Sequence, residues 1–338
     1  MKKEQVKKLG IVVGVMMVSL CLIFLASPQH LWAAGKVTLK CGYGVGVKHS
    51  VHEMSLRISK RAAELSNGTL NIECYPAAQL GTEEQLIEQM QLKSVEMMPD
   101  LSHAKFASIL PWWGFGSLPF LFASLDEYGK VWNTPLGGEM EKRLLAKGFR
   151  RLGWMQYGIR SVLCVKPVKS MADLKGVKIR VMANPDLIKA WKLVGASPVP
   201  MAWAEVYSAL QAKVIDAMES PPSSVYYAAK AHEVAKNYTM TRHQITAATV
   251  VIAEWAWKKL TPVQQRALIT AVNEGTTWQR EYNNTENVEA IKLMKQAGVK
   301  IYEIDRKPFR DAVLPVHNDF TNRIGWKSLL KEIKAVTD

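Results

Sequence analysis

The chain has 338 residues, of which 48% are hydrophobic, so it is a globular protein long enough for two domains. Its formal net charge of +14 favours anionic partners, but no run of five or six basic residues occurs, so nucleic acid is not an expected partner. The four cysteines are too few and too scattered for a disulfide framework or a zinc site, and we expect no metal and no cofactor.

The first 34 residues have the layout of an export signal. Four lysines precede an uncharged apolar run at residues 9–26, and the small residues Ala33 and Ala34 follow it. We therefore predict cleavage after Ala33 or Ala34 and a mature chain in the periplasm. Its net charge falls to +11, because the removed segment carries four lysines and one glutamate. The apolar run is also long enough to cross a bilayer, so an uncleaved anchor is the alternative, whereas Cys21 fits a lipoprotein cleavage site poorly.

The first part of the mature chain alternates strands with helices. Strands are predicted at residues 37–44, 69–76 and 95–101, and helices at residues 51–65 and 82–93. The second helix opens with Thr82 and Gln85 at the spacing of a capping box. This alternation predicts βαβ units and a mostly parallel sheet. Cys41 and Cys74 each close a predicted strand, so a disulfide between neighbouring strands stays an alternative to free thiols.

The same pattern restarts near residue 160. Strands are predicted at residues 160–165, 177–182, 197–201 and 214–218, with helices at 185–194 and 204–213. Thr261 and Pro262 then begin a helix that has no further proline and one glycine up to Gln296. Roughly 35 helical residues at about 1.5 Å each reach about 50 Å. Such a length suits a helix that lies across two domains.

Three features of the sequence could indicate an enzyme, but each also has a simpler structural explanation. GYGVG (42–46) lacks the third glycine and the later acidic residue of a dinucleotide-binding loop, so it predicts a tight turn. His49 and His52 could share a helix face, but no third metal ligand accompanies them. We interpret them as surface histidines, with a ligand contact as the alternative. The aromatic segment 111–122 predicts interdomain packing rather than a cofactor site.

Polar and aromatic residues gather where the predicted strands end. Alternate apolar residues share one face of the strand at 177–182, and Arg180 lies on the other, which by itself indicates a solvated face. Trp203 precedes a helix, and Glu219 and Ser220 lie at the tip of the following strand. Ligands of open α/β sheets bind beyond the carboxyl ends of the strands. We therefore expect these residues to line one cleft.

The order of several segments resembles the solute receptors of tripartite ATP-independent periplasmic (TRAP) transporters, of the type first named for dicarboxylate binding. The segments are QLGTEEQLIEQM (79–90), LPFLF (118–122), DLKGVKIRV (173–181) and VGASPVPMAWAEVYSALQAKVIDAMESP (194–221), followed by the long helix. The resemblance covers about residues 37–320. It implies an α/β periplasmic binding protein fold with two lobes, a ligand cleft between them and a long helix that spans both.

The resemblance also implies roles for particular residues. It assigns Arg180 to the substrate carboxylate, which suits the planar fork of a guanidinium, Arg160 to a second ligand-facing position and Trp203 to a wall of the site. Glu219 and Ser220 fall where many members carry Glu-Asn, and the serine has a shorter reach. Some members hold the acid through a metal ion, a role that Glu219 could serve.

The implied function is an extracytoplasmic receptor that binds a small organic acid without catalysis and delivers it to a TRAP membrane permease. We expect the lobes to close by hinge motion. Their predicted extents are residues 35–157 with about 246–285 for lobe I, and residues 158–245 with about 286–338 for lobe II. The alternatives are an exported α/β enzyme with Glu219 or His49 as base, and a ligand-binding sensor receptor. A paired acid and base would favour the enzyme, and the sequence offers none.

Overall fold

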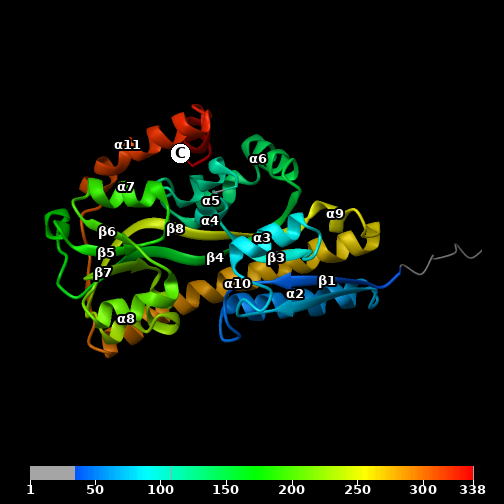
Figure 1. Cartoon of the computed structure of the whole chain (residues 1–338), viewed down its shortest axis with the longest axis horizontal. Helices are drawn as coiled ribbons and strands as arrows, with labels where there is room; N and C mark the ends of the chain where they lie inside the picture. The colour runs from blue at the N-terminus through cyan, green and yellow to red at the C-terminus, as the bar shows by residue number, and fades with distance from the viewer. Residues whose placement is uncertain (1–34, 108, 338) are drawn as a thin grey trace, which may run out of the picture. The chain divides into compact units, whose positions relative to one another are not determined.

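Two long antiparallel strands, β4 (Phe149–Cys164) and β8 (Asn237–Ala253), form the centre of the sheet (Figure 1). The computed structural model describes residues 35–107 and 109–337, and the predicted export signal at residues 1–34 lies outside them. The sheet has nine strands in the order β2-β1-β3-β8-β4-β7-β5-β6, with β9 paired to β8.

The other strands extend the sheet from opposite ends of β4 and β8. Those at one end are β1 (Val37–Gly42), β2 (Leu70–Tyr75) and β3 (Met97–Ser102). Those at the other end are β5 (Lys178–Val181), β6 (Ser197–Pro200), β7 (Ala217–Ser220) and β9 (Lys300–Tyr302). β3 pairs with β8 near Val251, whereas β7 pairs with β4 at residues 161–164. The two long strands thus run from one α/β half to the other, as a two-lobed fold requires.

The ladder between β4 and β8 is irregular where it passes between the halves. Its register shifts three times between Arg151 and Val162. Gly158 has φ of +113°, a conformation that side-chain-bearing residues rarely adopt. Bulges of this kind bend a strand and increase its twist.

Helix α10 (Pro262–Gln296) has the predicted bounds. Its start is fixed by a capping box in which Thr261 and Gln264 exchange side-chain and backbone hydrogen bonds. The helix packs against α2 (Ser50–Leu65), β4 and the short π-helix η4 at Ser224–Ala228. A Cβ atom on Gly275 would lie 2.5 Å from Cγ1 of Ile58, so this glycine permits the close approach of α10 to α2.

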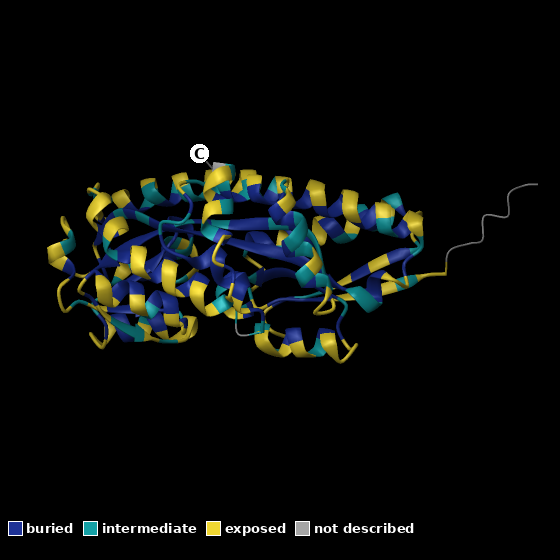
Figure 2. Ribbon diagram, turned by 90° about the horizontal axis from the view of Figure 1, so that it is seen from above, coloured by how far each residue is buried: buried dark blue, intermediate teal, exposed yellow. Residues whose placement is uncertain are grey.

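The remaining helices cover the sheet, and buried residues concentrate on the strands between them (Figure 2). The α-helices are α3 (Glu83–Gln91), α4 (His103–Phe106), α5 (Leu125–Val131), α6 (Pro135–Leu145), α7 (Pro185–Leu193), α8 (Val206–Gln211), α9 (Glu254–Trp257), α11 (Lys307–Ile324) and α12 (Leu329–Thr337). Within residues 35–107 and 109–337, no helix is both long and apolar enough to cross a membrane.

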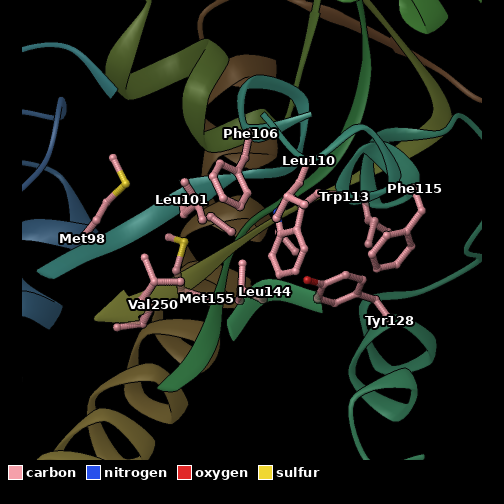
Figure 3. Close-up of a cluster of buried hydrophobic side chains, with 14 of the residues drawn as sticks. Met98, Leu101, Phe106, Leu110, Trp113, Phe115, Tyr128, Leu144, Met155 and Val250 are labelled. Atoms are coloured by element: carbon pink, nitrogen blue, oxygen red, sulfur yellow. The ribbon is translucent and has the colours of Figure 1, made fainter. Parts of the chain in front are cut away.

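The aromatic segment 111–122 is part of the hydrophobic core (Figure 3). It begins with the 3₁₀-helix η1 at Pro111–Ser117, and Trp113 packs near Tyr128. Buried His103 lies between them, with Nδ1 2.8 Å from the Trp113 carbonyl and Nε2 2.6 Å from the Tyr128 hydroxyl. The segment also contacts residues predicted to belong to the other lobe: the Phe120 amide donates to the His243 carbonyl at 2.6 Å, and His317 Nε2 lies 2.6 Å from the Pro119 carbonyl. It therefore packs in the core and also against β8 and α11, in line with the predicted interdomain packing.

Several predicted boundaries were wrong. The strand predicted at 214–218 begins later, at Ala217, because Lys213 adopts a left-handed conformation with φ of +59° and ends the preceding turn. The helix predicted at 204–213 is α8 (Val206–Gln211), preceded by the 3₁₀ turn η3 at Trp203–Glu205. Strand β8 and the first eleven residues of β4 were not predicted.

Candidate functional site

Arg180 lies on β5 and is buried, with only 4% of its surface exposed. The simplest interpretation of its strand pattern, a solvated face, is therefore wrong. Its Nε and Nη2 atoms donate to the Met201 carbonyl at 3.1 and 2.9 Å. This contact fixes one edge of the guanidinium and leaves the Nη1 end without a hydrogen-bond partner among the described residues.

The charge of Arg180 is not balanced by any adjacent carboxylate within the described part of the chain. Burial lowers its pKa to about 10, the attraction of Glu219 opposes this shift, and repulsion from Arg160 adds to it. A buried cation in this state gains more from an incoming anion than a solvated one does, because little water screens the pair.

Trp203 lies beside Arg180 at the start of η3. The Arg180 Cζ atom is 5.6 Å from the centre of the Trp203 ring, within range of a cation–π contact. Trp203 itself is 39% exposed, unusual for so large an apolar side chain. The indole therefore offers a partly open aromatic surface next to the guanidinium.

Arg160, on β4, differs from Arg180 because it has a carboxylate partner. Its Nε donates to Oε2 of Glu219, and its Nη2 donates to Oε1 at 2.8 Å and to the Glu219 carbonyl at 2.6 Å. Arg160 is 5% exposed and Glu219 is fully buried. This bidentate pair joins β4 to β7, the strand that lies between Arg160 and Arg180 in the sheet.

His243, on β8, completes the contacts of the Glu219 carboxylate. Its Nε2 lies 3.1 Å from Oε2 of Glu219, and its Nδ1 lies 2.9 Å from the Thr241 hydroxyl. Burial by itself raises the pKa of Glu219, but the charge of Arg160 and the hydrogen bonds from His243 and Arg160 lower it to about 2. Because Glu219 is ionised and can only accept, Nε2 of His243 carries the proton and donates it.

The sequence pattern of one protein family, described as bacterial extracellular solute-binding protein, family 7, matches residues 41–323. The chain belongs to this family. It is 33% identical over 278 residues to the 2,3-diketo-L-gulonate-binding periplasmic protein of Escherichia coli K12, covering 82% of this chain and 84% of the relative.

Solved structures of similar receptors support the assignment. A TRAP periplasmic solute-binding protein from Pseudomonas putida F1, with bound D-glucuronate, is 30% identical with a TM-score of 0.81, covering 89% of this chain and 98% of that one. One from Citrobacter koseri, also with D-glucuronate, is 31% identical with a TM-score of 0.79, covering 89% and 99%.

The structure of this solute-binding protein brings four of the five predicted site residues onto adjacent strands. Arg160, Arg180, Glu219 and Ser220 lie on β4, β5 and β7, and Trp203 lies against Arg180. Ser220 is buried beside Glu219 and its carbonyl accepts from the Tyr238 hydroxyl at 2.9 Å. His243 was not predicted from the sequence, because it lies on a strand that was not predicted either.

Glu219 and His49, the two residues considered as enzymatic bases, both have hydrogen-bond partners within the protein. The Glu219 carboxylate is held by Arg160 and His243, and its low pKa makes it a weak proton acceptor. His49 caps α2 by accepting from the Val51 amide at 3.2 Å, and burial lowers its pKa to about 4. His49 and His52 are half-buried, so they lie only partly at the surface. Among residues 35–107 and 109–337, no group of three or more His, Cys, Asp or Glu side chains is placed to hold a metal.

A second buried polar group lies in the other half, on β3 and β4. The Tyr157 hydroxyl donates to Oδ2 of Asp100 at 3.2 Å. Burial, and to a smaller extent the nearby charge of Glu83, raises the pKa of Asp100 to about 7. Tyr157 stands three residues before Arg160 on the irregular part of β4, next to Gly158. Asp100 was not predicted, since a single aspartate in an apolar strand carries no recognisable motif.

Proposed function

We propose that this solute-binding protein holds the carboxylate of a small hydroxylated acid on the Nη1 end of Arg180. The observation that carries the proposal is the contrast between the two buried arginines. Arg160 has a carboxylate partner in Glu219, whereas Arg180 has only a carbonyl and the face of Trp203. A ligand carboxylate supplies the missing anion and two acceptors for the planar guanidinium.

Each remaining site residue has a distinct part in this proposal. Glu219 and His243 hold Arg160 in place rather than contacting the acid, because the carboxylate of Glu219 is already fully engaged. Trp203 provides an aromatic wall for the ligand, since aromatic faces pack well on the apolar side of a sugar ring. Ser220 lines the site beside Glu219 at the end of β7.

The nature of the ligand is proposed from the relatives. Two solved receptors similar to this chain carry D-glucuronate, and the E. coli relative is named for 2,3-diketo-L-gulonate. All are six-carbon acids that combine one carboxylate with several oxygen substituents. We propose a ligand of this class, which the protein releases unchanged to the membrane subunits of a TRAP permease.

Binding is coupled to closure of two lobes in this proposal. Lobe I comprises residues 35–157 and about 246–285, and lobe II comprises residues 158–245 and about 286–338. The irregular β4–β8 ladder around Gly158 supports a hinge at this boundary. Closure excludes water from the Arg180–carboxylate pair and gives the permease a way to distinguish loaded from empty receptor. Export by residues 1–34 places this cycle in the periplasm.

The test compares D-glucuronate with D-glucose, which has the same ring but no carboxylate. We expect D-glucuronate to bind in calorimetric titration and to change tryptophan fluorescence, and Trp203→Ala to remove much of that change. D-glucose is expected to give neither signal. Equal binding of both sugars would contradict a carboxylate site. Mass spectrometry of the recovered acid completes the test, since a converted product would indicate an enzyme.

A further inference from the structure

Cys41 and Cys74 lie directly opposite each other on neighbouring parallel strands. The register of β1 and β2 pairs Cys41 with Cys74, one step after Lys40 with Glu73. Paired residues on adjacent strands project from the same face of a sheet. Cys41 is buried with Leu39 on that face, while Cys74 is half-buried. Both are free thiols in this structure.

The spacing of such a pair suits a covalent bond. Neighbouring strands lie about 4.7–4.9 Å apart, and disulfides bridge Cα atoms separated by about 4.4–6.8 Å. Cys41 and Cys74 are direct partners in the β1–β2 register, so their Cα atoms fall in this range. We propose that Cys41 and Cys74 form a disulfide in the exported protein, which ties the edge strand β2 to β1.

The surroundings of the pair give the two sulfurs different reactivity. Hydrogen bonds from Cys41 and Tyr43 lower the pKa of Cys74, and burial opposes this shift. The pKa of Cys41 is raised by its hydrogen bond to Cys74 and by burial. Cys74 is also the more exposed of the two. It is therefore the thiol that reacts first with an external oxidant, since the thiolate is the nucleophile.

The oxidant is a disulfide of the periplasm, either a protein or a small molecule. The Cys74 thiolate attacks one of its sulfurs, the external S–S bond breaks, and one external thiolate leaves. Cys41 then attacks the Cys74 sulfur of the mixed disulfide, and its proton passes to the second external thiolate. Two protein thiols are oxidised by two electrons, and the external disulfide is reduced to two thiols.

Cys164 provides an internal control within the same chain. It lies at the end of β4, where its partners in the ladder are Ala217 and Asn237. It therefore has no cysteine across from it and stays reduced under the same conditions. The inference concerns β1 and β2 only, so it is independent of whether Arg180 binds an acid.

The experiment is thiol mapping of the full chain after export. Protein released from the periplasm without reductant is denatured in iodoacetamide, digested and analysed by mass spectrometry. We expect the Cys41 and Cys74 peptides to be joined and only Cys164 to be alkylated, so the mature chain loses two of its three reactive thiols. Alkylation of all three cysteines, or a bridge that includes Cys164, would overturn the inference.

Single substitutions test the order of the two steps. Cys41→Ser protein treated with oxidised glutathione is expected to accumulate a stable mixed disulfide at Cys74. Cys74→Ser protein keeps the buried thiols of Cys41 and Cys164 and is expected to gain little glutathione in the same time. Equal modification of the two variants, or preferential modification of Cys41, would contradict the proposed role of Cys74.

Discussion

Two buried arginines lie on the sheet, and among the described residues only Arg160 of the two has a carboxylate partner. Arg160 is neutralised by Glu219, and removal of one member of a buried ion pair leaves an uncompensated charge. In Arg180 the uncompensated charge is already present. We therefore expect different effects from substitutions of the two residues: loss of the Arg160 pair should lower the stability of the fold, whereas loss of Arg180 should weaken the proposed ligand binding.

Glu219→Gln tests the first of these roles. The substitution keeps the shape of the side chain but leaves Arg160 buried without an anion. We expect a loss of about 3–5 kcal/mol in the free energy of unfolding, measured by urea denaturation. Glu303→Gln is the matched control, because its ion pair with Arg242 is largely exposed and should contribute less than about 1 kcal/mol. Similar small losses in both variants would show that the buried pair is unimportant for stability.

Asp100 predicts a pH dependence of stability. Its pKa of about 7 in the folded protein lies above the value of about 3.9 in an unfolded chain. Folding therefore favours its protonated form, and the stability from this group is present below about pH 4 and is lost as the pH rises through 7.

Asp100→Asn removes this titration. The free energy of unfolding of the variant relative to wild type should rise between pH 4 and pH 8, by up to roughly 4 kcal/mol. Chemical denaturation at several pH values measures the difference. A difference that stays constant over this range would contradict the raised pKa.

The part of β4 that joins the two halves contains Gly158, whose backbone conformation is strained for any other residue. A Cβ atom on Gly158 would lie 2.6 Å from Nδ2 of Asn287, and the φ of +113° adds strain. Asn287 also donates to the Tyr157 carbonyl at 3.1 Å and accepts from the Ser223 amide at 3.0 Å. This asparagine thus connects α10 to β4 and to the segment that precedes η4.

Gly158→Ala should therefore disturb both stability and closure. We expect a loss of about 1–3 kcal/mol in the free energy of unfolding, from the strained conformation and the displaced asparagine. Gly148→Ala is a control with positive φ of +86° but open space around its Cα. If the two variants lose the same stability, the contact with Asn287 has no special importance.

Elements with strong local signals could be predicted from sequence, and those defined by tertiary contacts could not. The capping box at Thr82 and the Thr261-Pro262 start correctly predicted where α3 and α10 begin. Strand β8 was missed because residues 245–253 form an apolar run without a clear period, which a buried helix could also show. Its polar residues Thr241 and His243 look like a solvent face, but both are buried.

The candidate site likewise depends on tertiary contacts that the sequence does not reveal. The resemblance pointed to Arg160, Arg180, Trp203, Glu219 and Ser220, and no local pattern indicated that Glu219 would be held by Arg160 and His243. That pairing depends on the antiparallel register of β4 with β7 and β8, which joins residues 59 and 24 positions apart in the chain. Side-chain roles that depend on such register need the three-dimensional structure.

The whole protein consists of two α/β halves joined by β4, β8 and α10 (Figure 1). In the proposed cycle, the ligand occupies the site at the ends of β5 and β7, and closure of the lobes would bury its carboxylate against Arg180. Loss of the guanidinium leaves that carboxylate buried without an adequate partner, a state that costs about 2–5 kcal/mol in protein interfaces. This corresponds to weakening by about 30- to 3,000-fold.

The most direct test is calorimetric titration of D-glucuronate into wild type, Arg180→Ala and Arg180→Lys, with Lys178→Ala as control on the same strand. We predict that Arg180→Ala weakens binding by about 30- to 3,000-fold. Arg180→Lys keeps the charge but not the planar fork, so it should recover only part of the affinity. Lys178→Ala should bind with wild-type affinity. Melting curves establish that each variant is folded. Wild-type affinity in folded Arg180→Ala protein would contradict the account.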